Sequence, residues 1–152
     1  MSRGNRGHEY LTDDEFRAWQ GCLEATNSTL RETDERLVAD HGISVKEYDV
    51  LITLYNAPDA RLRMTELAER VMLTPSGVTH LVTRLERAGL IERVVDPDDR
   101  RSFFAVLTRA GDDRLREARP THNEVIRSQL TARLSAAQLA TMGRLFDRVL
   151  QR

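Results

Sequence analysis

Apolar side chains recur along most of this chain at the three-, four- and seven-residue spacing of amphipathic helices. The first such stretch predicts a helix over 13–39, with an apolar stripe made of Phe16, Leu23, Leu30 and Leu37. A second stretch predicts a helix over 45–55, with an apolar face made of Tyr48, Leu51, Leu54 and Tyr55. Gly42 and the run 56–59 supply the residues that end these two helices.

Helix starts are marked by a hydroxyl residue followed three positions later by Glu or Gln. The two side chains bind each other's backbone N–H groups, which are otherwise unsatisfied at a helix N-terminus. The pattern marks starts at Thr12 with Glu15, Ser44 with Glu47, and Ser135 with Gln138. The last of these predicts a C-terminal helix whose apolar side carries Leu139, Met142, Phe146, Val149 and Leu150.

The interval 63–111 contains two short helices and then two strands. Thr65 is suited to cap the first helix, and Thr74 with Pro75 to begin the second, which Gly89 ends. The spans 91–95 and 102–107 are predicted to pair as strands around a charged tip, 96–101. This order of helix, tight turn, helix and hairpin predicts a winged helix-turn-helix.

The second of these helices has two contrasting faces. Its apolar face carries Val78, Leu81, Val82, Leu85 and Ala88. Its polar face carries Ser76, Thr79, His80, Thr83, Arg84 and Arg87, groups that suit the edges of bases and the phosphates of DNA. A simpler reading is that Arg84 and Arg87 only pair with Glu86 or Glu92 on a solvated surface.

Beyond the hairpin the chain returns to helix, with Thr108 as the expected cap. Pro120 predicts either a kink or two abutting helices, in which case Thr121 and Glu124 would restart the second. The apolar stripes of the first and last helices exceed what a small head can cover. This surplus predicts a partner, most simply a second copy of the chain.

Composition places limits on the class of protein. The chain has 152 residues, 40% hydrophobic and 31% charged, with a net charge of −1, so any affinity for nucleic acid must come from local clusters of positive charge. No apolar run approaches the length of a membrane span, and Met1 to His8 lacks the apolar core of a signal peptide. We therefore expect a cytoplasmic protein, in which the sole cysteine, Cys22, forms no internal disulfide.

Motifs of catalysis are missing from the sequence. It has no glycine-rich phosphate loop, no Gly-x-Ser-x-Gly elbow and no His-Glu-x-x-His pair. The histidines His8, His41, His80 and His122 fall in four different segments and show no closely spaced ligand set. We expect no metal, no cofactor and no enzymatic activity.

Four segments, taken in order, resemble one known family. They are LTPSGVT (73–79), LERAGLIER (85–93), DRRS (99–102) and LTRAG (107–111). The set is similar to the winged helix-turn-helix core of MarR-type transcriptional regulators, and the likeness extends over nearly the whole chain. It implies a mainly α fold with a small β-hairpin wing. Within one compact domain we expect an N-terminal arm and helix (1–40), a DNA-binding region (41–111) and C-terminal dimerisation helices (112–152).

The resemblance also implies which residues bind DNA. The helix that begins at Pro75 would enter the major groove, and Arg101 would reach the minor groove, oriented by Asp99, with Arg100 on a phosphate. The expected DNA-binding residues are Thr65, Thr74, Ser76, Thr79, His80, Thr83, Arg84, Asp99, Arg100 and Arg101. We expect a homodimer on a pseudo-palindromic operator, acting as a repressor.

The input signal has more than one reading. The resemblance implies release of DNA when a small aromatic or phenolic ligand binds, in a pocket expected to include Trp19, Cys22, Tyr48, Asp49 and Arg127. One alternative is a peroxide sensor on the same scaffold that uses Cys22. Another is a module that uses the helix pair to bind a protein rather than DNA.

Overall fold

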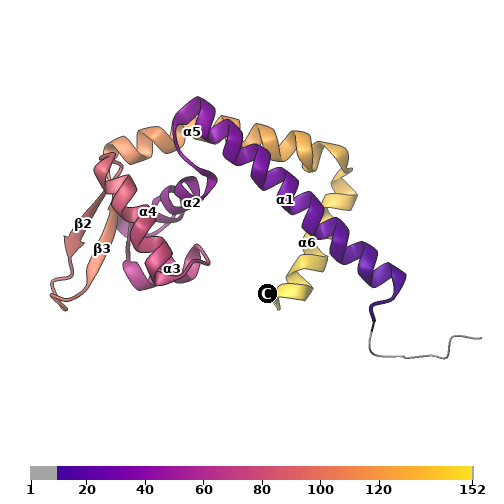
Figure 1. The fold of residues 1–152 in the computed structure, drawn as a ribbon, viewed down its shortest axis with the longest axis horizontal. Helices are drawn as coiled ribbons and strands as arrows, with labels where there is room; N and C mark the ends of the chain where they lie inside the picture. The colour runs from indigo at the N-terminus through magenta and orange to yellow at the C-terminus, as the bar shows by residue number, and fades with distance from the viewer. Residues whose placement is uncertain (1–9, 152) are drawn as a thin grey trace, which may run out of the picture. The chain divides into compact units, whose positions relative to one another are not determined.

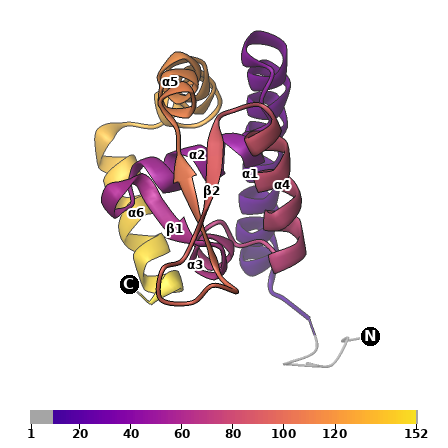
Figure 2. The same ribbon diagram turned by 90° about the vertical axis from the view of Figure 1, so that its left-hand side faces the viewer.

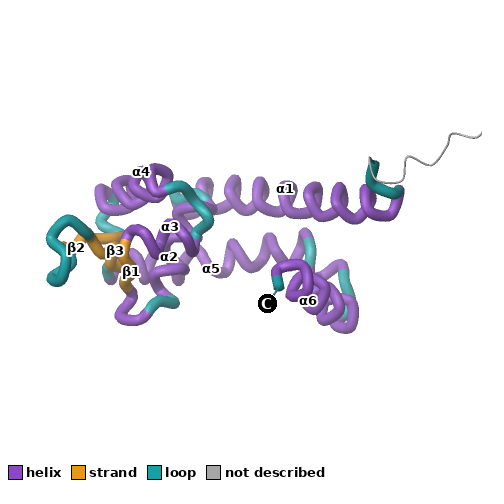
Figure 3. The backbone as a smooth tube through the Cα atoms, turned by 90° about the horizontal axis from the view of Figure 1, so that it is seen from below, coloured by secondary structure: helices purple, strands orange, loops and turns teal. Residues whose placement is uncertain are grey.

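The computed structural model describes residues 10–151, which are mostly helical and include a small sheet (Figures 1 and 3). The helices are α1 Asp13–His41, α2 Val45–Tyr55, α3 Met64–Arg70, α4 Pro75–Arg87, α5 Arg109–Gln129 and α6 Ala136–Leu150. The strands are β1 Arg61–Arg63, β2 Ile91–Val95 and β3 Phe103–Leu107, and 3-10 turns occur at Pro58–Ala60 and Thr131–Arg133. The predicted fold class, mainly α with a hairpin wing, is confirmed.

The chain divides into two compact units, which we describe separately. The head unit comprises residues 33–124, and the terminal unit comprises the described residues 10–32 and 125–151. The boundaries fall inside α1 and α5, so each of these helices contributes to both units. The division predicted from the sequence, at 40/41 and 111/112, stays a prediction.

The head unit contains a three-stranded antiparallel sheet in the order β1-β3-β2. β3 pairs with β2 from Val95 opposite Phe103 to Ile91 opposite Leu107, as the predicted hairpin requires. Its other edge pairs with β1, where Leu62 lies opposite Ala105. β1 was not predicted, because a run of three residues is too short to show a period and its partner lies about forty residues away in the chain.

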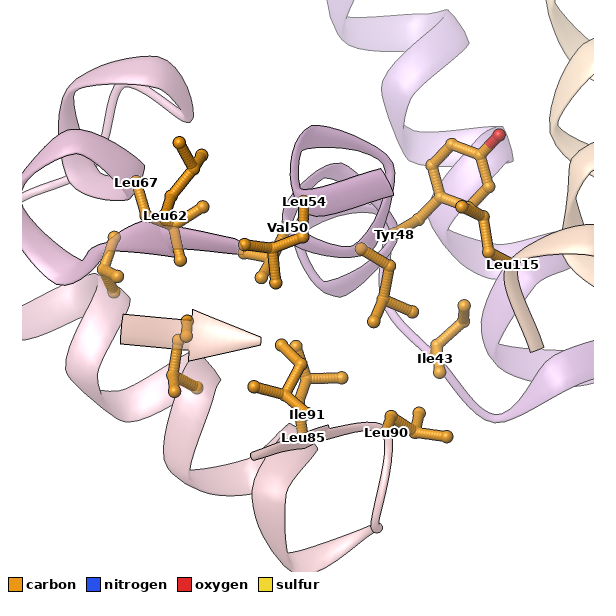
Figure 4. Close-up of a cluster of buried hydrophobic side chains, with 14 of the residues drawn as sticks. Ile43, Tyr48, Val50, Leu54, Leu62, Leu67, Leu85, Leu90, Ile91 and Leu115 are labelled. Atoms are coloured by element: carbon orange, nitrogen blue, oxygen red, sulfur yellow. The ribbon is translucent and has the colours of Figure 1, made fainter. Parts of the chain in front are cut away.

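A continuous apolar core fills the head unit between the helices and the sheet (Figure 4). Side chains from α2, α4 and the start of β2 have almost no contact with solvent, among them Val50, Leu51, Leu54, Val78, Val82, Leu85 and Ile91. The apolar faces predicted for α2 and α4 thus form the core, with two exceptions. Tyr55 is 39% exposed and stacks against the Arg119 guanidinium at 5.0 Å, and Ala88 is exposed.

The capping patterns have the predicted geometry. The Ser44 hydroxyl accepts the Glu47 N–H at 3.2 Å, while the Glu47 carboxylate accepts the Ser44 N–H at 2.8 Å. The equivalent pairs Thr12 with Glu15 and Ser135 with Gln138 are also present. The role predicted for Thr65 is wrong. α3 begins at Met64 with Arg63 as its N-cap, and the Glu66 carboxylate accepts the Arg63 N–H at 3.2 Å. Thr65 therefore lies within the first turn.

Pro120 does not end the fifth helix. α5 runs unbroken from Arg109 to Gln129, so the restart predicted at Thr121 is wrong. Tertiary contacts hold the helix near the proline. Ala118 is fully buried, and the Thr121 hydroxyl forms a hydrogen bond of 2.8 Å with His41 Nε2. These contacts offset the one hydrogen bond that proline cannot donate.

The terminal unit leaves much apolar surface exposed. α6 contains no buried residue, although its apolar side chains lie at helical spacing. On α1, three residues of the predicted stripe, Phe16, Leu23 and Leu30, are between 41% and 54% exposed, while the fourth, Leu37, is fully buried in the head unit. Within the terminal unit, the exposed large hydrophobic residues of these two helices are Phe16, Trp19, Leu23, Leu30, Leu145, Phe146, Val149 and Leu150.

Met72 occupies a strained position in the turn between α3 and α4. Its φ is +51°, and its neighbour Leu73 donates to the Ala68 carbonyl at 3.1 Å, which closes the turn. Glycine adopts this left-handed conformation without steric cost, and Met72 has 89% of its surface exposed, so its side chain packs little.

We therefore expect Met72→Gly to raise the free energy of unfolding by about 1 kcal/mol, as measured by urea denaturation. Met72→Ala is the matched control. It shortens the side chain but keeps a Cβ, and it should change stability little. Equal effects of the two substitutions would contradict the strain at this position.

Candidate nucleic-acid interface

α3 and α4 are joined by a tight turn, and α4 lies beside the hairpin β2–β3 (Figure 2). Thr74 begins α4 by accepting the Gly77 N–H at 3.2 Å, and Pro75 occupies the first helical position. While the apolar face of α4 packs into the core, its polar face is open to solvent at Ser76, Thr79, His80, Arg84 and Arg87. Thr83 is half-buried.

The threonine hydroxyls of α4 are already engaged with the backbone. Thr79 donates to the Pro75 carbonyl at 2.9 Å, and Thr83 donates to the Thr79 carbonyl at 2.7 Å. A hydroxyl has one hydrogen to donate and two lone pairs that accept. In this conformation the exposed Thr79 hydroxyl can therefore accept from a base amino group but has no hydrogen left to donate.

Arg84 forms an ion pair with a buried carboxylate of α2. Its Nε lies 3.3 Å from Glu47 Oε1, and the Glu47 side chain is only 5% exposed. The pairing suggested by the sequence, with Glu86 or Glu92, is wrong for Arg84, because folding places the N-terminus of α2 directly beneath it. The anchor uses Nε and leaves the outer nitrogens of this 60% exposed side chain facing solvent.

The tip of the wing presents two arginines. Arg100 is exposed, and the Arg101 side chain is 95% exposed. Asp99 Oδ1 accepts the Arg101 N–H at 3.1 Å and lies 3.6 Å from its Nε, while Asp99 Oδ2 accepts the Ser102 hydroxyl at 2.8 Å. The Ser102 hydroxyl, followed by the Arg101 N–H, lowers the pKa of the Asp99 carboxyl. The lowered pKa favours the ionised form of Asp99 beside Arg101.

Below the tip, a buried carboxylate fixes the hairpin to β1. Asp96 is 1% exposed, and its Oδ2 lies 2.8 Å from Arg63 Nη2. Its Oδ1 accepts the Asp98 N–H at 2.9 Å. Arg63 and Arg61 also place their guanidinium groups over the Phe104 ring, at 5.6 and 5.0 Å. The sequence analysis missed these two arginines, because the alternation Arg-Leu-Arg at 61–63 is too short to indicate a strand with one polar face.

A hollow of about 660 Å³ joins these parts into one surface. It is lined by residues from the start of α3, from α4 and from both strands of the wing: Arg63, Met64, Thr65, Thr79, Glu86, Arg93, Arg101, Ser102 and Phe103. The fold thus brings Thr65, Thr79 and Arg101, which the sequence analysis selected separately, to a single site. Three of the lining residues are arginines, and each of them lies within 4 Å of a carboxylate: Arg63 of Asp96, Arg93 of Glu86 and Arg101 of Asp99.

The residues predicted to line a ligand pocket fall in both units. In the head unit, Tyr48 is buried and stacks on His122, with ring centroids 4.3 Å apart. Burial raises the pKa of the Tyr48 phenol, and loss of surrounding water raises the pKa of Asp49, an effect that His122 partly opposes. Trp19, Cys22 and Arg127 are exposed in the terminal unit. A pocket made from this set stays a prediction.

Metal ligands do not gather anywhere within residues 10–151. No group of three or more His, Cys, Asp or Glu side chains there is placed to hold an ion, and His8 lies outside the described residues. Among the described helices, none has the length and apolar character needed to cross a bilayer. The polar start Met1 to His8 also falls outside the described part of the chain.

Comparison with known proteins places this architecture in a family. The sequence profile of the MarR family matches residues 43–103. Two curated relatives from Bacillus subtilis are each 35% identical. One is the uncharacterized HTH-type transcriptional regulator YkoM, over 83 residues (55% of this chain, 53% of the relative). The other is the HTH-type transcriptional repressor YetL, over 88 residues (58% and 53%). The chain thus spans about half the length of these curated relatives.

A solved structure matches over far more of the chain. The MarR family transcriptional regulator Sco3205 from Streptomyces coelicolor, crystallised in complex with DNA, is 34% identical with a TM-score of 0.88. The match covers 94% of this chain and 90% of Sco3205. It confirms the resemblance predicted from the sequence, and with it the expectation of a regulator rather than an enzyme. This chain belongs to the MarR family of transcriptional regulators.

Proposed function

We propose that this chain is a sequence-specific double-stranded DNA-binding repressor that acts as a homodimer on a pseudo-palindromic operator. The observation that carries the proposal is the surface described above. Thr79 on the polar face of α4 and Arg101 at the wing tip line the same arginine-rich hollow, and most of the other polar residues of α4, together with Arg100, are open to solvent. Such a surface matches the combination of phosphate and base-edge contacts that duplex recognition requires.

The proposed contacts follow the positions of the side chains. The α4 face (Ser76, Thr79, His80 and Arg84) would lie in the major groove, with Thr65 and Thr74 on the backbone beside it. Arg101 would enter the minor groove, where negative potential is concentrated, and Arg100 would bind a phosphate. Thr83 belongs to this predicted set, but its half-buried position makes it the weakest candidate for a direct base contact.

A homodimer is supported by the uncovered apolar side chains of the terminal unit. Within the terminal unit, eight large hydrophobic residues of α1 and α6 are more than 40% exposed in the single chain, a surface that monomeric soluble proteins rarely leave open. Closed two-fold symmetry is the commonest way to cover such a surface with one kind of chain. Two copies of α4 would then meet successive major grooves, with half-sites about 10 base pairs apart.

The proposed input is a small aromatic or phenolic ligand whose binding releases the DNA. Within the head unit, the feature that supports this input is the aromatic pair Tyr48 and His122, where α2 meets α5. The alternative input is oxidation of Cys22, whose exposed side chain can be reached by a peroxide. Loss of operator binding on treatment with peroxide, abolished by Cys22→Ser, would favour oxidation over a ligand.

The test is selection of bound sequences from random duplex DNA with the purified full chain, followed by titration of the best site at several salt concentrations. We expect an inverted repeat with half-sites about 10 base pairs apart. If the dimer neutralises about six phosphates, its affinity should fall roughly 1000-fold between 50 and 200 mM salt. Repeating the selection with candidate phenolic compounds tests the input.

Two outcomes would contradict the proposal. Enrichment of no common sequence would remove sequence-specific recognition. If the protein bound no duplex at any of the salt concentrations, the protein-interaction alternative would be favoured. Binding to DNA through phosphates would show itself as an affinity that falls as salt rises, because such contacts release counterions.

A further inference from the structure

Arg93 connects the wing to α4. It lies in β2, and its side chain is 26% exposed. Its Nη2 donates to the Thr83 hydroxyl at 2.7 Å and to the Thr79 carbonyl at 3.3 Å. Its Nη1 lies 3.6 Å from Glu86 Oε2, while its Nε is buried without a hydrogen-bond partner among the described residues. One side chain of the hairpin therefore contacts two successive turns of the helix.

The Thr83 hydroxyl is the central atom of this connection. It accepts from Arg93 and donates its only hydrogen to the Thr79 carbonyl at 2.7 Å. A charged guanidinium makes stronger hydrogen bonds than a neutral donor, and a partly buried site screens them less than open solvent does. Thr83 thus serves the link between wing and helix, and has no hydrogen left for a base.

We infer that Arg93 is a positioning residue that fixes the angle between α4 and the wing, so that both engage one DNA duplex together. The inference rests on the proposed function. If α4 and the wing are rigidly joined, the major-groove and minor-groove contacts form together. The entropy lost in orienting the wing relative to α4 has then already been lost in the free protein, before DNA binds. Without the link, the binding of α4 no longer places Arg101 at its groove.

Two simpler roles for Arg93 predict different results. If it only stabilised the fold, its loss would lower stability and leave the contribution of Arg101 unchanged. If it contacted a phosphate directly, its loss would weaken binding to every duplex and reduce the slope of log affinity against log salt by about 0.9 per contact. Only a positioning role couples Arg93 to Arg101.

The experiment is a double-mutant cycle on the selected operator with full-length protein: Arg93→Met, Arg101→Ala and both together. Methionine keeps the apolar stem and removes the donors. We expect Arg93→Met to weaken operator binding about 10-fold. In the Arg93→Met background, the fold-loss of operator affinity caused by Arg101→Ala should be about five times smaller than in the wild type. Arg116→Met is the matched control, since it removes another ion-paired arginine of the head unit, 2.7 Å from Asp112 on α5. Arg116→Met should change neither the operator affinity nor the loss of affinity caused by Arg101→Ala.

A measurement without DNA accompanies the cycle. Arg93→Met should speed hydrogen exchange of the wing amides 94–101 in the free protein, and Arg116→Met should not. Thr83→Val, which keeps the shape of the side chain, should reproduce both effects in weaker form if Arg93→Met folds poorly. Multiplicative costs in the cycle, or a lower salt slope without coupling, would overturn the inference. If the wild type bound no duplex, the proposed function would fail, and the exchange data would still report whether Arg93 holds the wing.

Discussion

Gly111→Ala is expected to destabilise the head unit by about 3 kcal/mol or more, because the added Cβ would make the closest contact found at any of the described glycines. A Cβ built at Gly111 would lie 2.1 Å from the Leu90 carbonyl oxygen and 2.7 Å from a methyl group of Leu107. The first of these atoms belongs to the backbone and cannot rotate away. Either α5 or the start of the hairpin must shift to admit the methyl group.

The surrounding hydrogen bonds make such a shift costly. The Thr108 hydroxyl donates to the Gly89 carbonyl at 2.7 Å and accepts the Gly111 N–H at 3.1 Å, while the Thr108 N–H donates to the Leu90 carbonyl at 3.2 Å. The start of α5 is therefore attached to the end of α4 over a few residues. Moving one breaks bonds to the other.

The measurement is urea denaturation at a fixed protomer concentration, because the stability of the proposed homodimer would depend on concentration. Gly21→Ala is the matched control. Gly21 also lies within a helix, with no atom within 4 Å of its added Cβ and away from the apolar stripe of α1, so the substitution should stabilise by roughly 0.5–1 kcal/mol. A Gly111→Ala protein as stable as the wild type would show that α5 does not pack against Leu90 in this way.

These contacts illustrate which parts of the fold are readable from the sequence. Capping pairs such as Ser44 with Glu47 depend on residues three apart, so the start of α2 was predicted to the residue. Thr74 with Pro75 and Gly89 likewise gave both ends of α4, since a cap, a proline and a left-handed glycine each act locally. The family resemblance added the order of these elements and was confirmed.

Features that depend on distant residues were missed. β1 exists because Arg61 to Arg63 find β3 about forty residues later, and no local period announces such a pairing. The same limit explains the partner of Arg84, which lies in α2 rather than on its own helix. At Pro120 the structure contradicts one of the two predicted outcomes, a pair of abutting helices, because packing around Ala118 and Thr121 holds α5 together; a kink stays a prediction.

The candidate site shows the same division. The residue types at the wing tip and on α4 are visible in the sequence, because a hairpin and an amphipathic helix fix which side chains face outward. The sequence does not show the buried contacts that position these side chains: Glu47 with Arg84, Asp96 with Arg63, and Arg93 with Thr83. Each of these supports spans at least ten residues of chain and forms only when the core of the head unit assembles.

Arg101→Ala is expected to weaken binding to the selected operator about 10- to 100-fold, at an energetic cost of about 1–3 kcal/mol per site. In the proposed complex this guanidinium enters a narrow minor groove, and Asp99 reduces its freedom before binding by holding the Arg101 N–H at 3.1 Å and lying 3.6 Å from Nε. Gel-shift or fluorescence-anisotropy titration of the purified chain measures the change.

Two comparisons separate this role from general electrostatics. Because the Arg101 side chain is 95% exposed, the substitution should leave the free energy of unfolding within about 0.5 kcal/mol of the wild type. Arg100→Ala removes an equal charge one residue away, and it should weaken all duplexes alike and reduce the salt slope by about one per contact. If Arg101 reads a narrow minor groove, the selected sites should be enriched in A·T pairs where the wing lies, and Arg101→Ala should abolish that enrichment. If the two variants behaved identically, Arg101 would be one more phosphate contact, and the wing would add affinity without reading the groove.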